Sequence, residues 1–326
     1  EFCLSGASNR WVNEEEPLYY KEVQIACKVK DTARSDWKIT NLAQITEDAD
    51  QNGNETDDRD STPDGGFEEP EGEERPTYKD DETGEYIPGQ EDDDDFEKVI
   101  IKEFDLALRK FIIAVSNDQT IEEDEYLRNE DGSYTREPVV DTSLLNTEDE
   151  EGNLITTAIY NHTKEPVLVQ KNDIVIYMLR AYNEGDIDGY AAEIKDHLPP
   201  YLEYVDGEFN DQYGWEVSDD GRTVTTRYLE NSLINKPVVN EEGKYELSYQ
   251  EVPVMCRVIE SAPTNENITN IADITEYQDD EKEEAIDRDS ESDNVELPND
   301  EDLPGYKGDE TGEYIPGQQD DDDFEK

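Results

Sequence analysis

The chain has 326 residues, of which 89 are acidic and 28 basic, so its formal net charge is -61, and 33% of its residues are hydrophobic. This excess of negative charge argues against nucleic acid and anionic lipid as partners, because both are bound through clustered lysine and arginine. It favours a multivalent cation, and Ca²⁺ is the hard cation that carboxylates bind. No apolar run approaches the roughly 18 residues of a membrane span, so we expect no membrane insertion.

The chain contains an internal sequence repeat. The run YKDDETGEYIPGQEDDDDFEK at residues 78–98 matches YKGDETGEYIPGQQDDDDFEK at residues 306–326, an offset of 228. Shorter matches at an offset of 229 join residues 20–29 to 249–258, 39–45 to 268–274, and 58–61 to 287–290. A repeat of this kind indicates an array of similar structural units.

The register of the repeat predicts four segments. Residues 1–46 are expected to be the C-terminal part of a preceding β-sandwich repeat, and residues 47–98 an acidic linker. Residues 99–275 are expected to form a complete repeat, and residues 276–326 a second acidic linker that leads to the next one. We therefore expect neighbouring repeats of the same protein on either side and a protein longer than this chain.

The first linker carries a candidate calcium site. Asp48, Asp50 and Asn52 offer oxygen ligands at alternate positions, and Gly53 permits the sharp turn of a calcium loop. The glutamate that normally closes such a loop is replaced by Arg59. Further carboxylates of the linker are available to complete a different cage: Asp57, Asp58, Asp60, Asp93 and Asp95. The alternative is a solvated, self-repelling spacer, which acidic segments with Pro and Gly favour.

The complete repeat reads as short β-strands with period-2 alternation. Phe104, Leu106, Leu108, Lys110 and Ile112 share one face of the first strand. Further strands are expected at residues 174–182, 190–198, 201–205, 223–228, 249–258 and 268–274, with an elaborated polar loop at 117–153. Many short strands without a helical period predict an all-β, Greek-key sandwich.

The cysteines and histidines indicate that the protein is not an enzyme. Cys3, Cys27 and Cys256 do not make a disulfide scaffold. Cys27 and Cys256 occupy equivalent positions of the repeat beside apolar residues, so we expect buried, unpaired thiols. With only two histidines in addition, little material remains for a zinc site or an activated nucleophile.

Four short runs of the complete repeat resemble a known family. They are Asn-Asp-Ile-Val-Ile-Tyr at 172–177, Tyr-Asn-Glu-Gly at 182–185, Glu-Ile-Lys-Asp-His-Leu-Pro at 193–199 and Leu-Glu-Tyr-Val at 202–205. These runs are similar to the immunoglobulin-like repeats found in tandem in Gram-positive bacterial surface proteins. The resemblance covers residues 99–275 and, for the last strands, 20–46. The resemblance implies an immunoglobulin-like fold and a location at the bacterial cell surface. In related collagen-adhesin and pilin domains, an acid promotes a spontaneous isopeptide bond between a lysine and an asparagine on the first and last strands.

Residues for such a crosslink are present. The chemistry requires a neutral amine, an amide carbonyl and a protonated acid, and burial in general lowers the pKa of a lysine and raises that of a carboxylic acid. Lys110, Asp196 and Asn270 each share a strand face with apolar residues. We therefore expect a Lys110–Asn270 bond, with Asp196 as the single-turnover acid and base and Asp141 as a competitor for that role. Alternatively, Lys110 reaches solvent at the sheet rim, and Asn270 caps a backbone group.

Together these features predict a stalk or adhesin repeat of an extracellular, cell-wall-associated protein, stiffened by Ca²⁺ and by the crosslink. A self-assembling filament, in which copies of the chain complete one another by strand addition, is the alternative. A third reading is a sandwich that itself binds carbohydrate or a host protein. No ligand can be identified from the sequence, because exposed-looking aromatic residues such as Trp215 have an ordinary role in a core.

Overall fold

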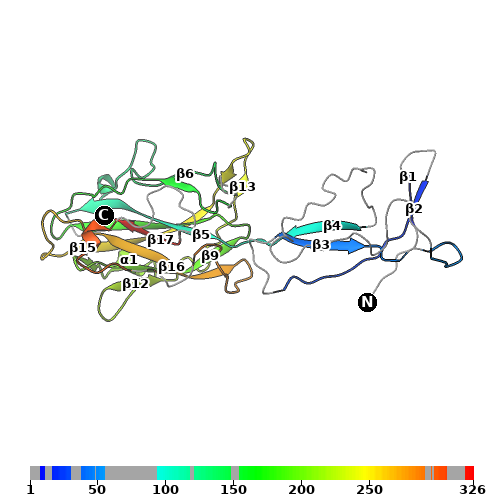
Figure 1. Cartoon of the computed structure of the whole chain (residues 1–326). Helices are drawn as coiled ribbons and strands as arrows, with labels where there is room; N and C mark the ends of the chain where they lie inside the picture. Colours follow the sequence, from blue (N-terminus) through cyan, green and yellow to red (C-terminus); the bar gives the residue numbers. More distant parts are fainter. Residues whose placement is uncertain are drawn as a thin grey trace. The chain divides into compact units, whose positions relative to one another are not determined.

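The computed structural model describes residues 8–11, 17–30, 38–47, 49–55, 94–117, 121–147, 154–290, 295, 297–306 and 320–326. The chain divides into two compact units, residues 1–101 and 102–326. Almost all of its regular structure consists of antiparallel β-strands (Figure 1), which confirms the predicted all-β class.

The first unit contains two antiparallel strand pairs among its described residues. One pair is β1 (Ser8–Trp11) with β2 (Pro17–Tyr20). The other is β3 (Lys38–Gln44) with β4 (Asp94–Ile100), in a register that places Asn41 opposite Glu97.

The second unit is built on two larger sheets. The first sheet has the order β10 (Leu202–Tyr204), β15 (Tyr249–Val258), β8 (Ile174–Asn183) and β5 (Leu106–Ser116). The second has the order β11 (Glu216–Val217), β12 (Thr223–Thr226), β9 (Gly189–His197), β16 (Asn270–Asp279) and β17 (Asp322–Glu325). The predicted strands thus lie close to where their alternation placed them.

Smaller elements flank these sheets. β6 (Val139–Asp141) pairs with β7 (Ile159–Asn161), and β13 (Val238–Val239) pairs with β14 (Tyr245–Glu246). The helices in the described part of the chain are single turns: η2 (Glu123–Glu125), α1 (Glu208–Asp211) and η3 (Leu303–Gly305). Among the described residues, no helix has the length and apolar character that crossing a membrane requires.

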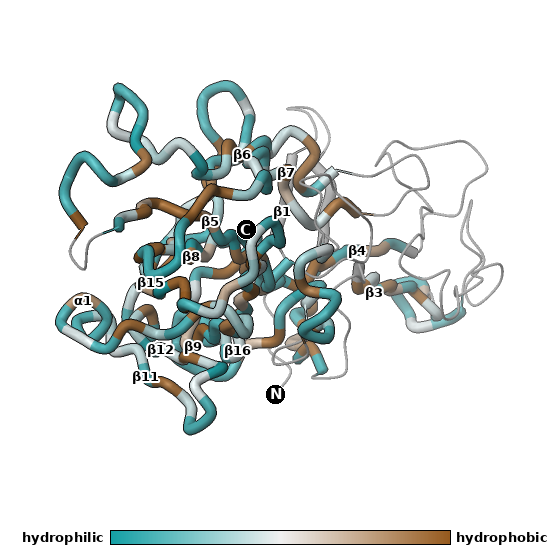
Figure 2. The backbone as a smooth tube through the Cα atoms, turned by 90° about the vertical axis from the view of Figure 1, so that its left-hand side faces the viewer, coloured by the Kyte–Doolittle hydropathy of each residue, from teal (hydrophilic) through white to brown (hydrophobic). Residues whose placement is uncertain are grey.

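The main hydrophobic core lies between the two sheets, so the unit is a sandwich. Leu106, Leu108 and Ile112 of β5 pack there with Ile194 of β9 and Ile274 of β16. Successive side chains of a strand point to opposite faces, and the inward set on β5 is the one that the alternation predicted. Figure 2 shows hydrophobic stretches along β5 and β15, whereas the outlying loops are mostly hydrophilic.

The outer face of the first sheet is covered as well. Phe111 and Ile113 point away from the main core and pack with Tyr126 and Tyr134, which lie in the polar segment predicted to be an elaborated loop. This cover buries both faces of β5, so the strand has only a slight exposure along its whole length. Trp215 is buried too, and its indole N–H donates to Pro253 O at 2.8 Å, so it has the ordinary core role.

β17 belongs to the sandwich, although it follows the segment predicted to be a linker. It pairs with β16, placing Glu325 opposite Asn270. Leu108 N also donates to Asp320 O at 2.8 Å, which joins the start of β17 to β5. The first unit has the same arrangement, because Asn41 and Glu97 are the repeat counterparts of Asn270 and Glu325. The boundary between the two compact units follows Ile101, whereas the repeat placed boundaries after residues 46 and 98. The described parts of residues 276–326 belong to the second unit.

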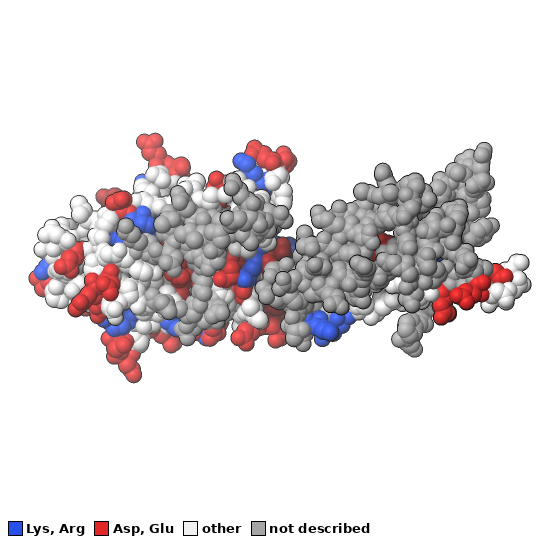
Figure 3. Space-filling model, viewed as in Figure 1, with Lys and Arg blue, Asp and Glu red and all other residues white. Residues whose placement is uncertain are grey.

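One expected thiol differs from its prediction. Cys256 of β15 is buried, as predicted, but Cys27 is exposed. Residues 21–30 are exposed throughout and belong to no named strand of the first unit, so Cys27 has no core around it. Figure 3 shows several separate groups of Asp and Glu side chains on the visible surface of the second unit, with fewer Lys and Arg between them.

Candidate functional site

Lys110, Asp196 and Asn270 meet inside the sandwich. Lys110 lies in β5 of the first sheet, whereas Asp196 in β9 and Asn270 in β16 belong to the second sheet. On the second sheet Asp196 lies opposite Ala272, and Asn270 lies two residues before Ala272 on the same face. The three side chains therefore join the two sheets across the core.

The contacts of the three residues converge on one oxygen. Lys110 Nζ donates to Asp196 Oδ2 in a short ion pair, and the side chains of both residues are completely buried. Asn270 Nδ2 is 3.4 Å from the same Oδ2. Asp196 Oδ1 and Asn270 Oδ1 are buried without a hydrogen-bond partner. The amine of Lys110 and the amide of Asn270 thus both contact the same oxygen of Asp196.

The surroundings of this group are partly apolar, and the buried Glu325, which pairs with Arg136, lies opposite Asn270. Lys110 Nζ lies 4.9 Å from the centroid of the Tyr177 ring. Burial, followed by the negative charge of Asp196, raises the pKa of the Cys256 thiol well above its ordinary value. Removing charged groups from water is costly unless they are paired, so Lys110 and Asp196 depend on each other in this core.

The structure decides between the alternatives that the sequence left open. Lys110 does not reach solvent, because its side chain is completely buried. Asp141 is exposed in β6 and accepts a hydrogen bond from Ser143 N at 2.9 Å, which helps to hold the pKa of its carboxyl below the ordinary value. It is therefore not the acid near Lys110. The side-chain amide of Asn270 contacts the Asp196 carboxylate, whereas the alternative placed a backbone group there.

The predicted calcium loop contains a tight turn. Asp50 accepts hydrogen bonds from Asn52 N at 2.7 Å and Asn54 N at 2.9 Å. Bonds from the side chain and backbone of Asn54 lower the pKa of Asp50 to about 2. Gly53, at a φ of 80°, supplies the left-handed residue that the turn requires.

The second unit repeats this turn without the predicted calcium pattern. Asp279, the counterpart of Asp50, accepts from Glu281 N at 2.9 Å and Glu283 N at 3.0 Å, and Lys282 takes the position of Gly53 at a φ of 68°. The recurrence indicates that the carboxylate at this position organises a hairpin turn. Asp95 lies exposed in β4, and its Oδ1 accepts from Phe96 N at 2.8 Å. The other predicted ligands lie outside the described residues: Asp48, Asp57, Asp58, Asp60 and Asp93.

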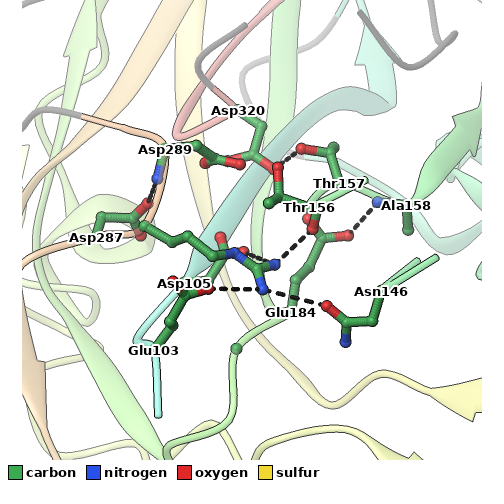
Figure 4. Close-up of polar contacts among 12 residues, drawn as sticks. Glu103, Asp105, Asn146, Thr156, Thr157, Ala158, Glu184, Asp287, Asp289 and Asp320 are labelled. Atoms are coloured by element: carbon green, nitrogen blue, oxygen red, sulfur yellow. Dashed lines mark hydrogen bonds and ion pairs between the residues drawn. The ribbon is translucent and has the colours of Figure 1, made fainter. Parts of the chain in front are cut away.

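The structure brings together a second group of acidic residues that the sequence did not predict as one site. Carboxylate oxygens of Asp105, Asp287, Asp289 and Asp320 lie within 4.8 Å of one another (Figure 4), and we refer to these four residues as the aspartate cluster. The repeat held a signal for it, because Asp287 and Asp289 are the counterparts of the proposed ligands Asp58 and Asp60. Asp105 lies just before β5, and only the tertiary structure shows that it joins them.

Burial and mutual repulsion dominate the electrostatics of the aspartate cluster. Burial raises the pKa of Asp105 and of Asp287 well above the ordinary range. Burial, together with the charge of Asp320, raises the pKa of Asp289 to about 7. Arg288 offsets part of the charge by pairing with Asp105 Oδ2 and, at 3.2 Å, with Glu103.

Comparison with known proteins does not extend this description: no protein-family model matches the chain, and no curated protein matches it significantly.

Proposed function

We propose that the chain is a structural part of an extracellular bacterial surface protein, in which the sandwich locks itself with an amide bond between Lys110 and Asn270. The observation that carries the proposal is the buried Lys110–Asp196–Asn270 group, with amine and amide on opposite sheets and an acid between them. A bond formed once per molecule serves durability rather than turnover. The internal repeat supports a stalk made of successive units, stiffened further by Ca²⁺.

The reaction needs only these three side chains. Transfer of one proton within the Lys110–Asp196 pair gives a neutral amine and a carboxylic acid, which a low-dielectric core tolerates better than separated charges. The amide of Asn270 turns about its Cβ–Cγ bond, so that Oδ1 accepts a hydrogen bond from Asp196, because the two ends of an amide group are nearly isosteric. The Nζ lone pair then attacks Asn270 Cγ, while Asp196 polarises the carbonyl.

Collapse of the tetrahedral intermediate completes the bond. Asp196 takes a proton from Nζ and delivers it to the departing nitrogen of Asn270, so the C–N bond of the side-chain amide breaks and ammonia leaves. A primary amine and a primary amide thereby become a secondary amide and ammonia. No electron is gained or lost. Asp196 is left as the carboxylic acid that formed when Lys110 gave up its proton, and it returns to the carboxylate when that proton leaves with the ammonia as ammonium.

Intact mass spectrometry of the denatured chain tests the proposal. The wild-type mass is expected to lie about 17 Da below the mass of the sequence, because one ammonia has been lost. Lys110→Ala and Asp196→Asn should each give the full mass of their own sequences. Lys171→Ala, which changes an exposed lysine of the same unit, is the matched control and should keep the deficit.

Fragment spectra of a protease digest should show residues 110 and 270 in one linked peptide pair. A wild-type chain with the full mass of its sequence after complete denaturation would falsify the crosslink, whatever the variants do.

A further inference from the structure

The aspartate cluster brings together segments that are far apart in the sequence. Asp105 precedes β5, Asp287 and Asp289 lie in the loop after β16, and Asp320 lies just before β17. Asp287 also fixes the backbone, because its Oδ2 accepts from Leu106 N at 2.8 Å and its Oδ1 accepts from Ser290 N at 3.1 Å. The site is thus held on the ends of two strands and one anchored loop.

A second observation indicates that these oxygens are arranged for a ligand. Asp105 is completely buried, yet its Oδ1 has no hydrogen-bond partner, and Arg288 engages only its other oxygen. Arg288 donates to Oδ2 of Asp105, and Figure 4 shows Asp105 in one group with Asp287, Asp289 and Asp320. A buried carboxylate oxygen without a partner is costly, and its cost is removed when a cation binds it.

The dimensions of the cluster suit one divalent ion. Ca²⁺ binds oxygen at 2.3–2.6 Å, so ligands on opposite sides of the ion lie about 5 Å apart. All four carboxylates lie within 4.8 Å of one another and therefore reach a common centre. The ligands are oxygens alone, which disfavours zinc and copper, and an all-protein carboxylate cage is more typical of Ca²⁺ than of Mg²⁺.

We infer that Asp105, Asp287, Asp289 and Asp320 bind one Ca²⁺ ion, which clamps the start of β5 to the loop after β16 and to the start of β17. Arg288 orients Asp105 from the other side and donates to Thr156 O at 2.7 Å. The site goes beyond the proposed crosslink, because all four ligands lie outside the stretch between Lys110 and Asn270. The ion therefore secures the part of the unit that the covalent bond leaves free.

The sequence indicates that the site recurs along the repeat. Asp58, Asp60 and Asp92 of the first unit are the counterparts of Asp287, Asp289 and Asp320. The counterpart of Asp105 would precede residue 1 in the register of the repeat. Calcium thus keeps the role that the linker composition suggested, with ligands from aspartates that recur in the repeat rather than from the Asp50 turn.

Calorimetric titration of the chelator-treated full chain with CaCl₂ tests the site. The double variant Asp287→Asn/Asp289→Asn is expected to bind one Ca²⁺ fewer per chain than the wild type. Asp280→Asn, an exposed aspartate of the neighbouring turn, is the matched control and should bind as the wild type does. Titration with MgCl₂ should show weaker binding than titration with CaCl₂. Lys110→Ala should bind Ca²⁺ as the wild type does, so a failure of the calcium site can be told apart from a failure of the crosslink.

Hydrogen exchange of the wild-type chain provides a test that needs no variant. Adding Ca²⁺ should slow amide exchange in peptides that cover residues 102–109, 284–290 and 320–326 and leave the centre of β8 unchanged. If Ca²⁺ leaves exchange in these three regions unchanged, the site is refuted, even when the double variant does not fold. Equal calcium stoichiometry in the wild type and a folded double variant has the same consequence.

Discussion

At the residue scale, the proposed function depends on polar side chains in an apolar core. Lys110 and Asp196 compensate each other's charge, and Asn270 completes the group. Replacing a buried pair by apolar residues is often harmless to stability, so a stabilising ion pair alone gives a weak reason for these residues. A single covalent bond between the two sheets gives a stronger one.

His162 makes a pH-dependent contribution to stability. It lies just after β7, with a side chain that is 3% exposed and Nε2 3.9 Å from Asp323 Oδ2. Burial, helped by the positive charge of Lys164, lowers its pKa to about 3. An unfolded histidine titrates near pH 6.5, so the unfolded chain binds more protons between about pH 6.5 and pH 3. We therefore expect stability to fall as the pH drops through this window, by at most about 1.4 kcal/mol per pH unit from this residue.

Denaturant unfolding at pH 7 and pH 4.5 measures this contribution. His162→Gln removes the titrating ring, so the variant should lose less stability on acidification than the wild type. Carboxylates that titrate in the same range are present in both proteins and cancel in the comparison. An equal loss in both proteins contradicts the assignment.

At the scale of elements, β17 shows how an acidic run becomes part of a core. Asp323 Oδ2 accepts from Lys110 N at 2.6 Å, and its carboxylate pairs with Lys164. Glu325, which is completely buried, pairs with Arg136. Each acidic side chain that points inward thus has a donor on the sandwich. Paired charges of this kind are compatible with burial, whereas an unpaired run stays in water.

Phe324 anchors β17 through apolar contact. It is buried with Ile271 and Leu303, and its ring lies against Tyr306 with a centroid distance of 5.3 Å. Phe324→Ala is expected to destabilise the second unit by about 3–5 kcal/mol, because it removes a large buried side chain and leaves a cavity. Thermal unfolding measures the loss, and hydrogen exchange in β16 and β17 should accelerate.

Phe96, the counterpart of Phe324 in β4, provides the control. Phe96→Ala should leave exchange in residues 270–279 and 320–326 as in the wild type. If Phe324→Ala also leaves it unchanged, β17 is not held by this contact.

At the scale of the whole molecule, the proposed crosslink would limit how far the second unit extends under force. With Lys110 bonded to Asn270, the chain between them cannot be pulled straight. These are about 160 residues, or roughly 550 Å of extended chain. Single-molecule stretching of Lys110→Ala should therefore show an unfolding step longer than that of the wild type by about this length. Equal steps in both proteins would show that no covalent tie is present.

The sequence by itself determined the strands, their inward faces and the repeat. Alternation alone placed Lys110, Asp196 and Asn270 on buried faces, because the period of a strand is short and local. The composition of the first linker also singled out Asp58 and Asp60, and the repeat relates them to Asp287 and Asp289 of the aspartate cluster.

Only the tertiary structure decided which of these residues meet. Asp196 was the preferred acid on local grounds and Asp141 its competitor, and the pairing of β9 with β16 places Asp196 beside Asn270. Asp105 and Asp320 are more than two hundred residues apart, and no local pattern joins them. From composition alone, the acidic run at 320–323 looks like a solvated spacer. In the structure Lys164 pairs with Asp323 and Arg136 pairs with Glu325, so the strand that contains them is buried. Burial of charge depends on partners from distant parts of the chain, so composition cannot predict it.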